Sequence, residues 1–154
     1  MVMIKQLTRT VCLLVLIIAS SWTLPERKSV GIEWLTIEEA QQRSEKEPRK
    51  VIMDVYTDWC GWCKKMDKTT FANEKVAQYV NENFYAVKLK ADSKEKVSFK
   101  GKEFSKGELA QAFRVSGYPT VVFFDKSFTK FQPVSGYRGA DDFLALLEQF
   151  NQAE

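Results

Sequence analysis

The sequence predicts an α/β fold, in which strands and helices alternate along a single domain. Two apolar segments, residues 51–57 and 120–125, are rich in β-forming residues and typical of buried strands. Segments with apolar residues at helical spacing lie between and beyond them, and no internal repeat or linker interrupts the order. The 154 residues, 45% of them hydrophobic and 28% charged, suffice for one globular domain with a core and for little more.

Residues 1–21 are predicted to form a signal peptide. Two basic residues precede an apolar run and small residues follow it, which places cleavage near Ser21. The remaining residues 22–154 would then be the single folded domain. The alternative is an uncleaved membrane anchor formed by residues 11–21, although its apolar run is shorter than the about 20 residues of a spanning helix.

Charge and composition exclude several classes of function. Removing residues 1–21 takes away two positive charges and lowers the formal net charge from +3 to +1. A balance this close to neutral argues against nucleic acid as a partner. Seven lysines between residues 88 and 106 are interspersed with carboxylates, so we expect a solvated segment there. The absence of histidine excludes a Ser-His-Asp triad, and no glycine pattern indicates a nucleotide site, so no organic cofactor is predicted.

The first predicted element is a helix within residues 34–47. Thr36 is placed to cap it, glutamates occupy its first turn and a proline follows its end. The next element is the strand over residues 51–57, whose nearly continuous apolar character indicates cover on both faces. Asp54 is the one acid in this run, and its presence there requires an explanation.

The rest of the chain continues the alternation. Helical spacing places Val76 and Val80 on one face, and a hairpin is predicted to turn at Lys100 and Gly101. Pro133 indicates an edge strand, because proline cannot donate to a ladder. The remaining elements are expected as a helix over 71–84, a strand over 84–92, the hairpin, a helix over about 105–113, strands over 120–125 and 129–137, and a helix over 140–151.

The two cysteines that follow residue 21, Cys60 and Cys63, carry the predicted chemistry. A bridge between them closes a very small loop and therefore stabilises little. A zinc site would need four ligands, whereas the chain has no histidine and no second cysteine pair, so redox chemistry is predicted instead. A helix beginning near Gly61 would put Cys60 at its N-terminus, where free amides and the helix dipole favour a thiolate. Cys60 would then attack a substrate, and Cys63 would resolve the mixed disulfide.

Around these cysteines the sequence resembles the thioredoxin superfamily. DWCGWCK stands where thioredoxins carry their redox motif, and GYPT at residues 117–120 matches their cis-proline loop. The resemblance covers about residues 34–150 and implies a central mixed β-sheet flanked by helices, with Pro119 facing the cysteines. The sequence is more similar to a periplasmic branch that includes thioredoxins of the sulfur-oxidation W type and the C-terminal domain of the transmembrane thiol-disulfide interchange protein. TTFANEKVAQYVNENF, FKGKEFS and GYRGADDFLALL carry that likeness.

The resemblance offers an explanation for Asp54. In this family a buried acid stands six residues before the first cysteine, and Asp54 occupies that position. Burial would raise the pKa of Asp54 toward neutrality and allow the carboxyl to exchange a proton near Cys63. The alternative is a structural role, in which Asp54 caps a local amide or pairs with Lys88.

The resemblance also implies a substrate-binding surface around Pro119. A cis peptide at Pro119 would expose the backbone of Tyr118, so that an extended substrate chain could pair with it. Trp59, Trp62 and Tyr118 would form an apolar rim around the sulfurs where a partner protein docks. For Trp59, packing in the core is the alternative.

The function implied by the resemblance is that of an exported thiol-disulfide oxidoreductase. Members of the periplasmic branch pass electrons to exported disulfide proteins, which implies a monomeric reductase supplied by an upstream thiol donor. The residue between the cysteines favours reduction as the direction. Strong oxidants stabilise the thiolate with a histidine or similar donor at that position, and Trp62 cannot do so. The alternatives are a disulfide-donating oxidase or isomerase and a non-catalytic binding or chaperone module. Two departures from the common pattern, Gly61-Trp62 in place of Gly-Pro and an apparent insertion at residues 93–107, would alter redox poise or partner choice.

Overall fold

The structure is a computed structural model that describes residues 31–153, so the predicted signal peptide lies outside the described residues. The elements are β1 (Trp34–Leu35), α2 (Ile37–Lys46), β2 (Lys50–Tyr56), α3 (Gly61–Met66), the π-helical turn η1 (Asp67–Phe71), α4 (Glu74–Asn83), β3 (Phe84–Lys90), β4 (Lys96–Phe99), β5 (Lys102–Ser105), α5 (Lys106–Ala112), β6 (Thr120–Phe124), β7 (Phe131–Ser135) and α6 (Ala140–Gln152). The predicted helices and strands are present, whereas β1 and η1 are elements that the sequence does not predict.

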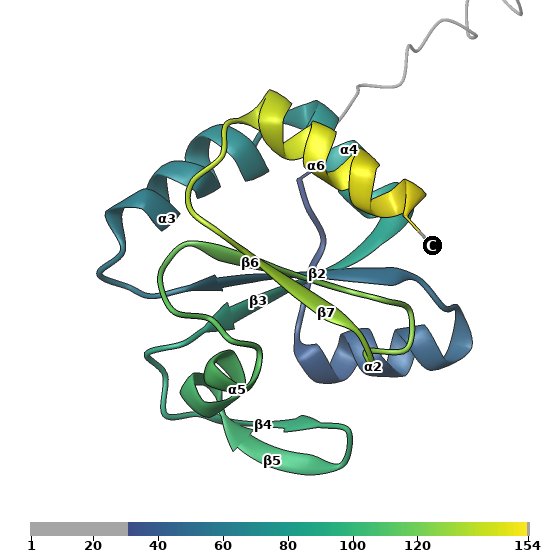
Figure 1. Cartoon of the computed structure of the whole chain (residues 1–154), viewed down its shortest axis with the longest axis vertical. Coiled ribbons are helices and arrows are strands. Elements are labelled where there is room, and N and C mark those ends of the chain that lie inside the picture. Colours follow the sequence, from purple (N-terminus) through teal and green to yellow (C-terminus); the bar gives the residue numbers. More distant parts are fainter. Residues whose placement is uncertain (1–30, 154) are drawn as a thin grey trace, which may run out of the picture.

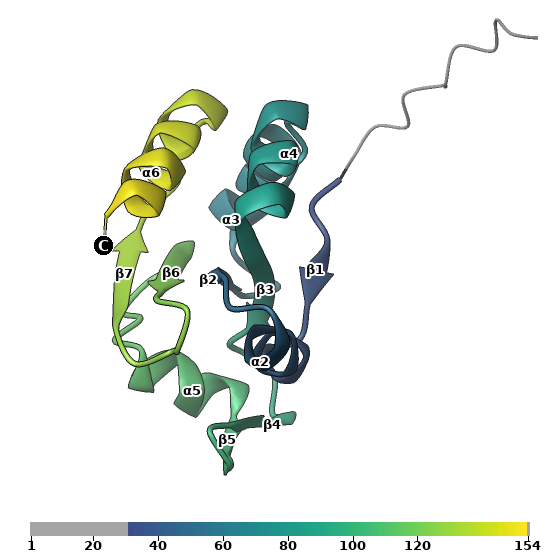
Figure 2. The same cartoon turned by 90° about the vertical axis from the view of Figure 1, so that its right-hand side faces the viewer.

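A five-stranded mixed sheet in the order β1-β3-β2-β6-β7 forms the centre of the molecule (Figure 1). β2 runs parallel to β3 and antiparallel to β6. The helices α3, α4 and α6 cover one face of this sheet, and α2 and α5 cover the other (Figure 2). This is the α/β thioredoxin fold that the resemblance implies, with the β4–β5 hairpin added beside α2 and α5.

Strand β2 owes its position at the centre of the sheet to its two apolar faces. Val51, Met53 and Val55 pack with residues of α2 and α5, whereas Ile52 packs with residues of α3, α4 and α6. The prediction of cover on both faces is therefore confirmed. Since side chains alternate along a strand, Asp54 lies on the same face as Ile52, beneath α3.

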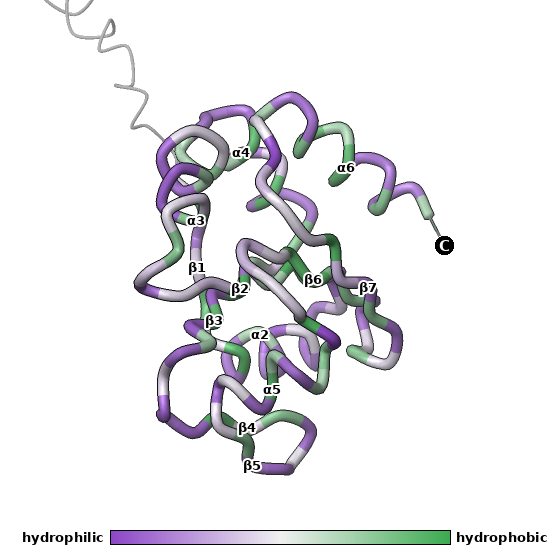
Figure 3. Tube along the Cα trace, turned by 60° about the vertical axis from the view of Figure 1, so that its left-hand side comes forward, coloured by the Kyte–Doolittle hydropathy of each residue, from purple (hydrophilic) through white to green (hydrophobic). Residues whose placement is uncertain are grey.

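The helix boundaries follow from capping residues. Thr36 caps α2, its side chain accepting the amide of Glu39 while the Glu39 carboxylate accepts the amide of Thr36. Asn73 caps α4 and Ser105 caps α5, each through a side-chain oxygen that accepts amides of the first turn. Figure 3 shows hydrophilic and hydrophobic residues alternating along α6, whose buried residues are Phe143 and Leu147. Each of these helices thus turns an apolar stripe toward the sheet.

The hairpin and the edge strand also agree with prediction. Lys100 and Gly101 have φ values of 49° and 73°, and two residues with positive φ are what a type I′ hairpin turn requires. The outer edge of β4 is covered by α2, because Gln41 donates to the carbonyl of Ser98 and accepts the amide of Lys100. Pro133 lies on β7 at the edge of the main sheet. Across residues 31–153, no helix combines the length and apolar character needed to cross a bilayer.

Candidate active site

The cysteine pair lies where β2 leads into α3. Cys60 is the N-cap of α3, and a disulfide joins it to Cys63. The backbone amide of Cys63 donates to Cys60 Sγ at 3.0 Å, so the sulfur of Cys60 receives one of the free amides of the helix N-terminus. The same amide would stabilise a Cys60 thiolate. Both cysteines are buried, Cys60 at 5% exposure and Cys63 at 3%. Since their burial is nearly equal, the feature that distinguishes Cys60 is its position at the N-cap of α3.

The loop before β6 lies beside the end of β2. The peptide bond between Tyr118 and Pro119 is cis, as the resemblance implies. Thr120 donates its hydroxyl to the carbonyl of Gly117 at 2.7 Å, and the carbonyl of Pro119 accepts the amide of Gly136 at 2.8 Å, so the loop is fixed at both sides. Thr120 lies opposite Val55 in the antiparallel pair, which brings Pro119 next to the segment that leads to Cys60.

The tryptophan directly before each cysteine has an exposed side chain. Trp59 is 71% exposed and Trp62 is 57% exposed, so the alternative of core packing for Trp59 is wrong. The Trp59 ring meets Tyr118 edge to face at 5.7 Å, and the Trp62 ring lies 5.4 Å from Tyr137. Exposed apolar rings of this size, close to a reactive pair, suit a docking surface. Tyr137 is a site residue that the sequence does not predict, because nothing local places it next to Trp62.

Asp54 lies buried beneath the site at 2% exposure. The register of β2 and β3 places it opposite Lys88, and its Oδ2 is 3.4 Å from Lys88 Nζ, whereas Oδ1 has no hydrogen-bond partner among the described residues. Lys88 also pairs with Asp67 of η1 and lies over the ring of Trp34 at 4.9 Å. The predicted burial and the alternative pair with Lys88 are therefore both present.

The environment of Asp54 perturbs its protonation. Burial raises the pKa of Asp54 to about 6, the charge of Lys88 opposes this rise, and the charge of Asp67 adds to it. A carboxyl with such a pKa changes protonation close to neutral pH, which suits it to accept and return protons. Lys88 pairs with both Asp54 and Asp67, and Asp67 belongs to η1. Asp54 therefore lies beneath η1, the segment that follows α3. The role of proton carrier stays a prediction.

Comparison with known proteins supplies the family. Residues 37–151 match the family described as Thioredoxin-like domain. The thiol:disulfide interchange protein DsbD of Actinobacillus pleuropneumoniae serotype 5b (strain L20) is 35% identical over 103 residues, which cover 66% of this chain and 16% of that protein. The chain therefore corresponds to a small part of the length of such relatives.

Solved structures agree with this match. The oxidised C-terminal domain of Neisseria meningitidis DsbD has a TM-score of 0.57 at 25% identity, covering 73% of this chain and 90% of that domain. The DsbH oxidoreductase has a TM-score of 0.65, covering 88% of this chain and 97% of its own. At 18% identity, the second comparison supports the fold alone.

Proposed function

The chain belongs to the Thioredoxin-like domain family, with a CxxC pair similar to that of DsbD domains, and from this premise we propose that it reduces disulfides in exported proteins. The observation that carries the proposal is the position of the Cys60–Cys63 disulfide at the N-terminus of α3, with an exposed tryptophan directly before each cysteine in the sequence. A redox pair at such a surface can meet a second protein, whereas a purely structural disulfide needs no docking rim.

The reaction starts from the dithiol form. The Cys60 thiolate attacks one sulfur of a substrate disulfide, that S–S bond breaks, and the departing substrate thiolate takes a proton. The Asp54 carboxylate accepts the proton of Cys63, and the Cys63 thiolate then attacks Cys60 Sγ. The S–S bond between Cys60 and the substrate breaks, and the departing substrate thiolate takes the proton back from Asp54. Two electrons have then passed to the substrate, and the chain holds the disulfide that the structure contains. A dithiol donor must reduce this disulfide before the next cycle.

Reduction is the direction that the site chemistry supports best. Trp62 occupies the position between the cysteines where a strong oxidant has a group that stabilises the thiolate. The reduction potential of the pair tests this directly, by equilibration in glutathione or dithiothreitol buffers and quantification of thiols. A value near about −270 mV agrees with a reductase, whereas a value near about −120 mV would make the chain a disulfide-donating oxidase. A chain that starts at residue 22 contains two cysteines, Cys60 and Cys63, so every thiol counted belongs to the pair.

Export is proposed from the order of basic, apolar and small residues within positions 1–21. Processing is tested by determining the N-terminus of the protein recovered from its native host. A mature chain that begins near residue 22 agrees with cleavage, and an intact chain recovered with membranes agrees with the anchor over residues 11–21.

Cysteine variants distinguish the proposed enzymatic function from a second candidate function. The exposed Trp59 and Trp62 favour a non-catalytic binding or chaperone module as the alternative. With Cys63→Ser, the mixed disulfide between Cys60 and a substrate cannot be resolved, so we expect a trapped covalent complex. With Cys60→Ser, we expect neither complex nor turnover of a disulfide substrate, while the unsubstituted mature chain serves as the control. Full cellular function of Cys60→Ser would instead establish the module.

A further inference from the structure

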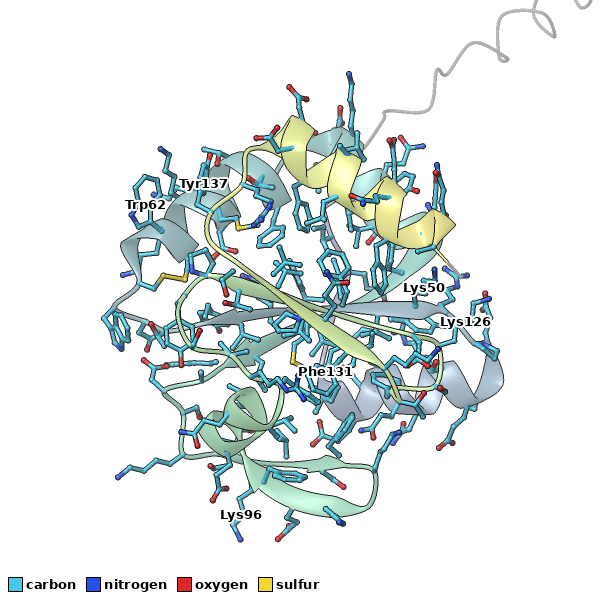
Figure 4. The ribbon with its side chains drawn as sticks, in the orientation of Figure 1. Lys50, Trp62, Lys96, Lys126, Phe131 and Tyr137 are labelled. Atoms are coloured by element: carbon cyan, nitrogen blue, oxygen red, sulfur yellow. A yellow bond between two sulfur atoms is a disulfide. The ribbon has the colours of Figure 1, made fainter. Side chains whose placement is uncertain are left out.

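Trp62 does not stand alone at the edge of the site. Lys65, one turn later on α3, places its ammonium 4.7 Å from the Trp62 ring and 5.0 Å from the Tyr137 ring. The hydroxyl of Tyr137 is hydrogen-bonded to Thr69 Oγ1 at 3.0 Å. Figure 4 shows Trp62 and Tyr137 side by side near the disulfide. The three side chains thus form a stack, with a cation held by two aromatic rings.

The charge of Lys65 has no carboxylate partner within residues 31–153, and the same is true of its exposed neighbours Lys64 and Lys68. Asp141 and Asp142, in the first turn of α6, which contacts η1, make no ion pair within residues 31–153. This side of the disulfide therefore presents positive charge that nothing in the described structure pairs.

The opposite end of the rim has a different balance. Asp58, next to Trp59, pairs with Lys90, and its backbone amide donates to Asp92 at 3.1 Å. Two carboxylates thus accompany one ammonium on the Trp59 side. A substrate segment that crosses the disulfide would meet negative charge near Trp59 and positive charge near Trp62.

We propose that Lys65, positioned by Trp62 and Tyr137, selects substrate disulfides that carry a carboxylate beside the attacked cysteine. The inference rests on the proposed function and names a class of substrate for the same site. The two rings restrict where the ammonium lies, and its exposure leaves it open to a carboxylate of the partner. Charge complementarity at the rim of an interface acts mainly on specificity and on the rate of encounter.

The experiment uses three disulfide-linked peptides that differ only in one residue beside the cysteine, which is glutamate, glutamine or lysine. The dithiothreitol-reduced protein is freed of reductant and mixed with each peptide, and the exchange rate constant is measured. We expect the glutamate peptide to react about two- to fivefold faster than the glutamine peptide at low salt, the effect of one exposed ion pair. The advantage should disappear at about 1 M salt, where the Debye length is about 3 Å.

Substitutions at Lys65 and Tyr137 test whether Lys65 causes the preference for the glutamate peptide. Lys65→Gln should bring the ratio of the rates with the glutamate and glutamine peptides down to about one, whatever its effect on the rates themselves. Lys96→Gln is the matched control, because Lys96 is an exposed lysine on the hairpin at the other end of the molecule (Figure 4). Tyr137→Phe keeps the ring and should keep the preference, whereas Tyr137→Leu should weaken it. The potential of each variant is measured as well, so that a change in the redox pair is distinguished from a change in substrate preference.

Several outcomes would overturn the inference. Equal rates with the glutamate and lysine peptides, or an unchanged preference in Lys65→Gln, would exclude selection by this residue. An equal slowing of all three peptides by Lys65→Gln would show that Lys65 has only a structural role. If the wild type reduces none of the peptides, the proposed function fails as well, whereas reduction of all three at one rate refutes the charge preference alone.

Discussion

Replacement of Asp54 by asparagine tests whether the buried carboxyl is the proton carrier. The pKa of Asp54 rises from its ordinary value of 3.8 to about 6 in the folded chain, chiefly because the carboxyl is buried. The folded protein therefore binds this proton more tightly than the unfolded chain does. Between about pH 3.8 and pH 6, the free energy of unfolding should fall as the pH rises.

The magnitude follows from that difference in pKa. At about 1.36 kcal/mol for each tenfold change in the ionisation constant, the ionised Asp54 costs the fold about 3 kcal/mol at pH 8. The amide of the Asp54→Asn variant carries no charge to bury, so the stability of this variant relative to wild type should rise by about 3 kcal/mol between pH 3.5 and pH 8. Any cost of the amide group itself is the same at each pH and does not contribute to this change.

The assay is urea unfolding of the oxidised protein, followed by circular dichroism at several pH values. A change of this size corresponds to a rise of roughly 1–2 M in the urea midpoint of Asp54→Asn relative to that of the wild type between pH 3.5 and pH 8. Asp58→Asn, which replaces a carboxylate that is 65% exposed, is the matched control. Its stability relative to wild type should not increase between pH 3.5 and pH 8. The rate at which the dithiol form reduces a substrate should fall in Asp54→Asn, because Cys63 loses its base. A stability difference that stays constant from pH 3.5 to pH 8 would refute the reasoning, and an unchanged reduction rate would refute the role of Asp54 in proton transfer.

Three substitutions away from the site test the packing and capping of the fold by the same unfolding assay. Thr36→Ala should cost about 1 kcal/mol, because the amide of Glu39 loses its acceptor, and an unchanged midpoint would show that the cap contributes nothing. Phe143→Ala should cost about 3–5 kcal/mol, since this ring is fully buried against Phe71, and a loss below about 2 kcal/mol would contradict its place in the core. Gly101→Val should cost about 1–2 kcal/mol because φ is +73° at this position, and a neutral result would mean that the turn adopts another conformation.

Much of the fold could be predicted because its determinants are local. Helical spacing, the cap at Thr36 and the hairpin turn at Lys100 and Gly101 each depend on residues within a few positions of one another. The position of Cys60 at a helix N-terminus follows from the same kind of information. The mixed sheet was implied only by the thioredoxin resemblance, and the strand order came from the structure, since periodicity specifies which face of a strand is apolar but not which strand lies beside it.

By itself, the sequence determined the alternation of elements, the redox pair and the acid in the central strand. Only the tertiary structure decided that Asp54 meets Lys88 across two parallel strands, that Trp59 faces solvent, and that Tyr137 reaches Trp62. The physical reason is that ionisation and exposure depend on what chain folding brings to within a few ångströms. Tyr137 lies 75 positions from Trp62 in the sequence, and no local pattern encodes a contact over that separation.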